Sequence, residues 1–367
     1  MQDYIRDLKR RCVSKLEKTS ARIQDTIPYT TTNGKYDDYS DNGHIAWWTN
    51  SFWAGIMWRM YRETGEKKYA EYAQSIENKI EKVLYGFNST DHDLGFLWLL
   101  TGVERYKQTG NERAKSNALL AASVLASRFN LKGNYIRAWN GEFNNGIAII
   151  DCMMNLPLLY WASDIQKDDR FYNIAKAHAD TVIKYFIREN GSSKHIVRFD
   201  TETGEYAQER GGQGYCEGSS WTRGQGWAIY GFIQSYQWTK DKRYLEVSEN
   251  AAKYFIEMAE KNDYKVKCDF CQPEQDELYD SSAAAIAACG MIELYKETGN
   301  SEYLDASIRL IQACDKNFCS WDDEEDEALL NFGCAMYSDK KQMTLIYGDY
   351  YFFHAVCELD TLLNENK

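Results

Sequence analysis

The chain has 367 residues, and its 55 acidic and 43 basic side chains give a formal net charge of -12. A protein this acidic repels nucleic acid and other long polyanions, so nucleic acid is not expected as a partner. No apolar stretch reaches the roughly 18 residues of a membrane span, and residues 1–22 lack the apolar core of a secretory signal, so we expect no membrane contact and a cytoplasmic location.

A short turn recurs between helical patterns along the chain. It is clearest at 61–65, 106–111 and 295–300, and weaker copies lie at 162–168 and 238–241. Gly directly after a periodic segment stops a helix, and the following residues start the next one. In chain order, helices are expected at 3–24, 50–63, 66–84, 94–108, 111–129, 146–163, 168–187, 220–238, 241–260, 278–297, 300–317 and 349–363.

Five turns give five helical hairpins, and the opening and closing helices can pair as a sixth. The first helix of each hairpin is rich in Trp, Gly, Ala and Met, as suits an inner helix, whereas the second carries Lys and Glu on one face, as suits an outer shell. The pattern predicts an all-α fold, an (α/α)6 toroid built as a single domain from residues 1–367. An open tetratricopeptide-type solenoid is the weaker alternative, because its period is about 34 residues whereas Tyr61 and Tyr106 are 45 residues apart.

The links between hairpins are much longer than the turns inside them. They are expected near 130–145, 188–219, 261–277 and 318–348. All of them must lie on the rim where the inner helices begin, and long irregular loops in a compact domain are usually functional. The stretch 195–200, followed by a turn at 202–204, predicts a small hairpin in the longest link. The acidic run 322–327 is expected to be a solvated loop.

Asp151 lies in the middle of the apolar run 146–161. Apolar surroundings disfavour the charged form of a carboxyl and raise its pKa. A carboxyl that keeps its proton near neutral pH can act as a general acid. From this run alone a helix cap is an equal alternative, and the position at the long-loop rim favours the acid.

Other chemistry-bearing residues gather at the same rim. Asp93 opens the second inner helix, while Asp280 and Asp349 open the fifth and sixth and are expected to be helix caps. Arg223, which follows Trp221 among glycines, is a candidate ligand for a carboxylate or sulfate. The residues that could belong either to the site or to the core are His92, Trp48, Trp139 and Trp227. The histidines interpreted as structural are His44, His178 and His354.

The ten cysteines are scattered, and several lie among Ala, Met and Val. A free thiol in such company behaves as a small buried hydrophobe. Cys268 and Cys271 form one C-x-x-C pair, but a structural zinc site needs four ligands, and no second pair has zinc-like spacing. We therefore expect reduced thiols and no metal.

Taken together, the rim motifs resemble those of unsaturated glucuronyl hydrolases, glycoside hydrolase family 88, from about Trp47 to the closing helix. The matching segments are 47–53, 92–96, 150–152, 155–159, 213–214, 220–225, 280–283 and 348–351. The resemblance implies an (α/α)6 barrel that uses neither metal nor organic cofactor. It implies removal of a Δ4,5-unsaturated uronate from the non-reducing end of lyase products such as chondroitin or hyaluronan disaccharides, so the implied partner is a small acidic unsaturated oligosaccharide.

The same resemblance implies roles for single residues. Asp151 corresponds to the catalytic acid/base and Asp93 to its partner carboxylate. The implied substrate-binding residues are His92, Trp48, Trp139, His195, Gln213, Arg223 and Trp227. In the implied hydration of a vinyl ether, Asp151 protonates C4, anionic Asp93 stabilises positive charge at C5 and the ring oxygen, and Asp151 then activates water.

Several alternatives stay open. Unsaturated rhamnogalacturonyl hydrolases share the barrel but differ around Asp151 and in the segment 221–224, and a glycosidase for saturated sugars could also use this barrel. A non-catalytic sugar-binding or scaffold protein would have little use for a costly buried acid. The loop 331–346, which contains Ser338, Lys340 and Lys341, leaves the preference for sulfate open. The chain is expected to be a monomer or a homodimer.

Overall fold

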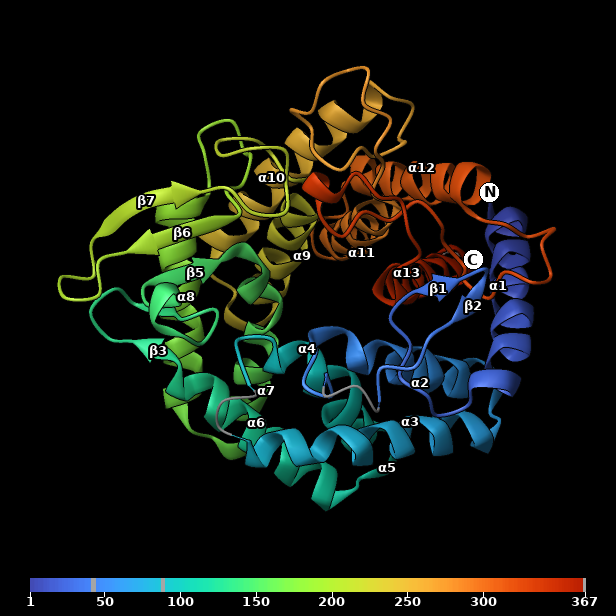
Figure 1. Ribbon diagram of the computed structural model, residues 1–367, viewed down its shortest axis with the longest axis horizontal. Coiled ribbons are helices and arrows are strands. Elements are labelled where there is room, and N and C mark those ends of the chain that lie inside the picture. The colour runs from blue at the N-terminus through green and yellow to red at the C-terminus, as the bar shows by residue number, and fades with distance from the viewer. Residues whose placement is uncertain (41–43, 87–89, 366–367) are drawn as a thin grey trace.

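The computed structural model describes residues 1–40, 44–86 and 90–365. Within them, six helical hairpins close into a double ring (Figure 1), which confirms the predicted all-α (α/α)6 toroid. The inner helices are α2 (Phe52–Thr64), α4 (Leu94–Trp98) with α5 (Glu104–Thr109), α7 (Leu156–Gln166), α9 (Thr222–Thr239), α11 (Ser281–Thr298) and α13 (Ile346–Glu365). The outer helices are α1 (Gln2–Ile23), α3 (Lys67–Ile80), α6 (Glu112–Ser127), α8 (Asp169–Phe186), α10 (Lys242–Glu260) and α12 (Ser301–Phe318). In this part of the chain no helix is both long enough and apolar enough to cross a membrane.

The short turns inside the hairpins depend on two local signals, one in the backbone and one in a side chain. The first helix ends at a residue with positive φ, and these residues are Gly65, Gly110, Lys167, Lys240 and Gly299. In four turns a side-chain oxygen then accepts a backbone N–H of the next helix, and these caps are Asn111, Asp168, Asp241 and Asn300. Three of the five φ-positive residues are Gly, which adopts the left-handed conformation at no steric cost, and the caps satisfy N–H groups that would otherwise be free.

The ring is closed by the pairing of α1 with α13, as the sequence predicts (Figure 1). Ile5, Leu8 and Leu16 lie on the buried side of α1. At the edge of the pair, Lys9 Nζ lies 3.0 Å from Asp360 Oδ2. The opening and closing helices therefore form the sixth hairpin without a covalent turn.

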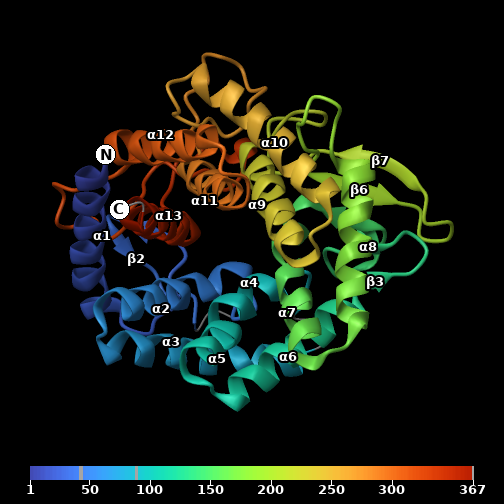
Figure 2. The same cartoon turned by 180° about the vertical axis from the view of Figure 1, so that it is seen from behind.

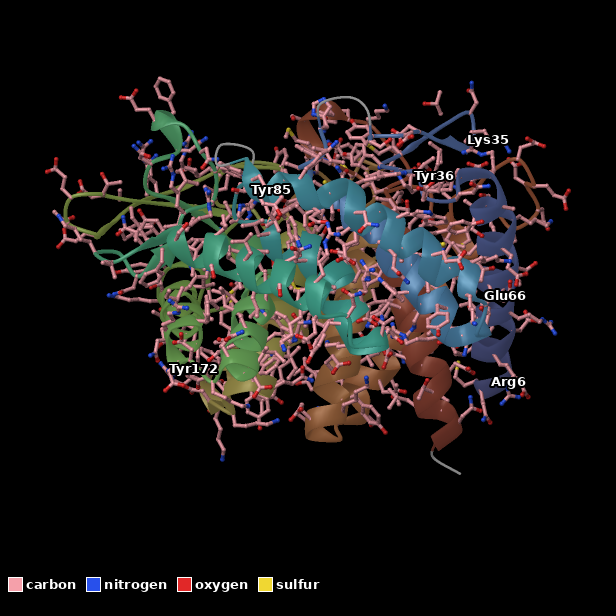
Figure 3. All side chains as sticks on the ribbon, turned by 90° about the horizontal axis from the view of Figure 1, so that it is seen from below. Arg6, Lys35, Tyr36, Glu66, Tyr85 and Tyr172 are labelled. Atoms are coloured by element: carbon pink, nitrogen blue, oxygen red, sulfur yellow. The ribbon has the colours of Figure 1, made fainter. Side chains whose placement is uncertain are left out.

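The two ends of the toroid differ. Figure 2 shows the molecule from the side of the short turns, such as those between α5 and α6 and between α7 and α8. In Figure 3, Lys35 and Tyr36 lie at the opposite, long-loop rim, whereas Arg6 and Tyr172 lie near the short-turn rim. The strands of the loops are β1 (Thr31–Thr32), β2 (Lys35–Tyr36), β3 (Phe129–Asn130), β4 (Tyr135–Ile136), β5 (Ile147–Ile149), β6 (Ile196–Phe199) and β7 (Tyr206–Arg210).

The longest loops are organised by a three-stranded antiparallel sheet in the order β5-β6-β7. Its β6–β7 hairpin confirms the hairpin predicted around 195–200. The third inner helix does not begin at 146, as predicted, because residues 147–149 pair with β6 and the chain then makes a 3-10 turn, Ile150–Met154, before α7. The second inner helix is interrupted by a π-helical turn, Leu99–Val103.

The acidic run 322–327 is only partly solvated, contrary to the prediction. Glu324 lies 3.1 Å from Lys18 on α1. Glu327 is 7% exposed and forms an ion pair with Arg22, also on α1. The basic residues of α1 hold this run against the closing seam of the ring, because burial of Glu327 requires an opposite charge.

Candidate active site

Asp151 is placed by a strand and a turn rather than by a helix. Ile149 pairs with Ile196 across the β5–β6 ladder, and the following 3-10 turn carries Asp151. The Asp151 side chain is 15% exposed. Burial raises the pKa of Asp151 to about 7, although the positive charge of Arg223 opposes the rise. The carboxyl can therefore hold or release a proton near neutral pH.

Asn155 connects Asp151 with Asp93. The Asn155 side chain is fully buried, and its Oδ1 accepts the backbone N–H of Phe96 at 2.8 Å. Its Nδ2 therefore faces Asp93 Oδ1 and the backbone oxygen of Asp151, each at 3.4 Å. A Cβ on Gly95 would lie 2.3 Å from Cα of Asn155, so this close approach of α4 requires glycine.

The surroundings of Asp93 disfavour the ionised form of its carboxyl. The residue precedes α4, and its side chain makes no cap hydrogen bond. Burial raises the pKa of Asp93 well above its ordinary range, and the negative charges of Asp91 and Asp151 raise it further. The surroundings of Asp93 in the substrate-free site therefore favour its protonated form, and the anionic role expected for it during the reaction stays a prediction.

His92 lies between Asp93 and Trp139. Its Nδ1 is 3.0 Å from the backbone oxygen of Ala138, and its Nε2 is 3.2 Å from Asp93 Oδ1. The rings of His92 and Trp139 meet edge to face, with centroids 6.1 Å apart. Burial lowers the pKa of His92, so the ring is neutral at neutral pH.

His195 occupies the corresponding place beside Asp151. Its Nε2 lies 3.5 Å from Asp151 Oδ2, and its Nδ1 accepts the backbone N–H of Gln213 at 3.1 Å. The ring packs on Trp221, with centroids 4.2 Å apart. A Cβ on Gly212 would lie 2.1 Å from His195 Nδ1, so only glycine fits there. Burial lowers the pKa of His195 to about 3.

Aromatic rings form a wall of the same site. The Phe96 ring lies 5.2 Å from Trp48 and 5.3 Å from Trp227, and Trp48 lies 4.7 Å from Tyr347, measured between centroids. Trp227 is fully buried, and its Nε1 has no hydrogen-bond partner among the described residues. Trp48 is only half-buried and can offer a face to a flat ligand, whereas Trp227 packs behind Phe96.

Arg223 is buried and bonded within the protein. Its guanidinium forms an ion pair with Asp280 and donates to the backbone oxygens of Cys334 and Ala335 at 2.7 and 2.8 Å. The guanidinium also lies over the Trp221 ring, 4.5 Å from its centroid. These contacts hold the loop around Ala335 against α9, and Arg223 brings a positive charge next to Asp151. Binding of an anion by Arg223 stays a prediction.

Of the two predicted helix caps, the structure confirms Asp280 but not Asp349. Asp280 caps α11 as predicted, because its side chain accepts the N–H of Ser282 at 3.2 Å. Asp349 is not a cap, because α13 begins three residues earlier. Its carboxylate instead accepts the N–H groups of Leu329 and Leu330, each at 2.8 Å, and the hydroxyl of Tyr36 at 2.6 Å.

The predicted site residues form one connected set. It comprises Trp48, His92, Asp93, Trp139, Asp151, His195, Gln213, Arg223 and Trp227, linked through Phe96, Asn155, Trp221 and Tyr347. Asn155, Gly95 and Gly212 have no role among the expectations from the sequence. Their signals are an Asn four residues after Asp151 and glycines close to Asp93 and Gln213. Of the histidines interpreted as structural, His178 accepts the backbone N–H of Ile136.

One group of side chains in the site has the composition of a metal-binding cluster. Ligand atoms of Asp91, His92 and Asp93 lie within 4.8 Å of one another. His92 Nδ1 already contacts the oxygen of Ala138, and Asp91 Oδ1 accepts the N–H of Asp93. The expectation that the protein uses no metal stays a prediction.

Known proteins resemble the chain over most of its length. The sequence pattern of the family described as Glycosyl Hydrolase Family 88 matches residues 19–235. The chain is 33% identical over 353 residues to an unsaturated glucuronyl hydrolase of Bacillus sp. strain GL1, covering 92% of each. It is 30% identical over 319 residues to an unsaturated chondroitin disaccharide hydrolase of Streptococcus pyogenes serotype M1, covering 84% of this chain and 80% of that one. A crystal structure of an unsaturated glucuronyl hydrolase specific for heparin matches with a TM-score of 0.91 at 26% identity, covering 99% of each chain.

Proposed function

Because the chain belongs to glycosyl hydrolase family 88, we propose that it removes the Δ4,5-unsaturated uronic acid from the non-reducing end of oligosaccharides released by polysaccharide lyases. Disaccharides of the chondroitin or hyaluronan type are the proposed substrates, and the similarity to an unsaturated chondroitin disaccharide hydrolase supports the chondroitin type. The observation that carries the proposal is the Asp151 carboxyl, whose pKa burial raises to about 7. Such a group can give up a proton and take one back within one reaction cycle.

In the proposed reaction Asp151 acts first as an acid and then as a base. Protonated Asp151 gives its proton to C4 of the C4=C5 double bond, and positive charge develops at C5 and the ring oxygen. Water attacks C5 and returns a proton to the Asp151 carboxylate. The hemiketal formed at C5 opens and expels the next sugar. Asp93 faces the developing charge and, as a carboxylate, stabilises it.

The remaining residues of the set are proposed to bind and orient the substrate. Trp48 and Trp139 are both half-buried, which suits stacking on a sugar ring. The positive charge of Arg223 favours the carboxylate of the uronate. His92, His195, Gln213 and Trp227 complete the proposed binding set. A single catalytic domain, a cytoplasmic location and a monomeric or homodimeric state stay predictions.

The test is the substitution Asp151→Asn, assayed with an unsaturated chondroitin disaccharide. Turnover, followed as loss of the ultraviolet absorbance of the double bond, should fall by roughly 10²–10⁴-fold or more, because general acid–base catalysis is lost. Substrate binding should persist. The matched control is Asp360→Asn, a carboxyl of α13 paired with Lys9 at the outer seam, which should retain turnover. Near-normal turnover by Asp151→Asn contradicts the proposal, and hydrolysis of the saturated disaccharide at an equal rate points to an ordinary glycosidase.

A further inference from the structure

The two carboxyls of the site face histidines whose tautomers are fixed by the backbone, and the two tautomers are opposite. We propose that His92 and His195 are positioning residues that decide where the protons of Asp93 and Asp151 reside. His92 presents a lone pair to Asp93 and accepts a hydrogen bond from the proton of that carboxyl, whereas His195 presents an N–H to Asp151. The catalytic consequence rests on the proposed function, but the two tautomers do not.

The tautomer of His92 follows from its contact with Ala138. A backbone oxygen only accepts hydrogen bonds, so the His92 Nδ1 that lies 3.0 Å from it must carry a proton. The same oxygen accepts the backbone N–H of His92 and the Arg128 guanidinium, at 3.1 and 3.0 Å, which fixes its position. The ring is neutral because burial lowers its pKa. Nε2 therefore bears a lone pair.

The lone pair on His92 Nε2 faces the carboxyl of Asp93. Nε2 lies 3.2 Å from Asp93 Oδ1 and has no hydrogen-bond partner elsewhere in the part of the chain that the structure describes. Two lone pairs at this distance repel each other, whereas a proton on Oδ1 turns the contact into a hydrogen bond. Burial and the negative charges of Asp91 and Asp151 raise the pKa of Asp93, and the opposing positive charge of Arg128 is the smaller influence, so the surroundings favour the same proton.

The tautomer of His195 is the reverse. The backbone N–H of Gln213 only donates, so the His195 Nδ1 that lies 3.1 Å from it bears the lone pair, and Nε2 carries the proton. Gly212 makes this contact possible, because a Cβ there would overlap Nδ1. The protonated Nε2 lies 3.5 Å from Asp151 Oδ2, a contact that is not yet a hydrogen bond, and neither atom has a hydrogen-bond partner among the described residues. Contacts of this kind are often long before substrate binds.

The two histidine contacts give the two carboxyls different roles in the reaction. When the contact shortens on substrate binding, Asp151 Oδ2 accepts the His195 N–H. The proton of protonated Asp151 then resides on Oδ1, which is the atom that donates to C4. Asp93 can pass its own proton to His92 Nε2 as positive charge develops on the sugar: the O–H bond breaks, an N–H bond forms, and a carboxylate is left facing the charge. The proton returns to Asp93 when water adds to C5.

The tautomers can be read directly from ¹⁵N–¹H NMR of the full chain labelled at histidine, without substrate. We expect the Nδ1–H tautomer for His92 and the Nε2–H tautomer for His195, each assigned by the signals that His92→Gln or His195→Gln removes. His178 is an internal standard, because its Nδ1 accepts the N–H of Ile136 and fixes the Nε2–H form. The opposite tautomer, or a charged ring, at either position overturns the proposal.

The pH profile of kcat/KM tests the catalytic consequence. Removal of the His195 N–H in His195→Ala disfavours the Asp151 carboxylate, so the alkaline limb should move to higher pH and the ratio of activity at pH 8 to that at pH 6 should rise about threefold or more. His195→Gln, whose amide can donate, should restore the limb. His354→Gln, which replaces a histidine of α13 outside the set, should leave it in place.

The outcomes separate the two proposals. An alkaline limb that does not move in His195→Ala overturns the role of His195. Absence of turnover by the unaltered chain overturns the proposed function, while the NMR result still decides the tautomers.

Discussion

Asp151 and Asp349 are two buried aspartates with equally raised pKa values and opposite surroundings. Burial raises the pKa of each to about 7. Asp349 accepts three hydrogen bonds, from Tyr36 and from two backbone N–H groups, whereas Asp151 Oδ2 has no hydrogen-bond partner among the described residues. A raised pKa therefore does not by itself mark a catalytic acid. The unused hydrogen-bonding capacity of Asp151 is what distinguishes it.

The largest difference is expected when each side chain is truncated. Asp349→Ala leaves the N–H groups of Leu329 and Leu330 and the hydroxyl of Tyr36 without their acceptor, so the free energy of unfolding should fall by about 3 kcal/mol or more. Asp151→Ala strands no strong donor and should cost much less. Urea unfolding at pH 6 measures both. Equal losses would show that the two carboxyls are bonded alike.

The second difference concerns the pH dependence of stability. Asp151 binds its proton more tightly in the folded state, with a pKa of about 7 against an ordinary value of 3.8, so its contribution to stability falls as pH rises between these values. Asp151→Asn removes this penalty. Relative to the unaltered chain, the variant should therefore gain roughly 2–3 kcal/mol of unfolding free energy between pH 5 and pH 8. A difference that stays constant over this range contradicts the raised pKa.

The smallest difference comes from Tyr36→Phe. The variant removes one donor to Asp349 and leaves the two backbone donors in place, so it should lower the free energy of unfolding by about 1 kcal/mol. The pH profile of turnover should not move, because the Tyr36 hydroxyl bonds to Asp349. Thermal unfolding and the ultraviolet assay give the two readings. A shifted profile would connect Asp349 to catalysis and remove the contrast between the two acids.

The sequence predicts those features that depend on neighbours in the chain. The hairpins follow from local signals such as Gly65 and Asn111, which act within one helical turn. The sequence does not predict β5, because residues 147–149 pair with residues 196–198, about 50 positions away. The apolar run around Asp151 suits a strand and a helix equally. The sequence predicts a cap at Asp349 because the partner of this side chain, Tyr36, lies 313 residues away.

The same limit applies to the site. The two acids and the aromatic residues are visible as unusual residue types at the starts of inner helices. Asn155 is visible only once α4 and α7 are placed side by side, because its hydrogen bonds to Phe96 and Asp93 cross between hairpins. The tautomers of His92 and His195 depend on single backbone atoms, and no pattern of residue types encodes them.

The noncovalent seam between α1 and α13 affects how the protein is made. During synthesis on the ribosome α1 emerges long before α13, because the contact between Lys9 and Asp360 spans 351 residues. Until α13 follows, the apolar side chains of Ile5, Leu8 and Leu16 lack this partner. Closure of the ring is thus a pairing of high sequence separation that cannot form until nearly the whole chain has been made, which makes it a late event in folding.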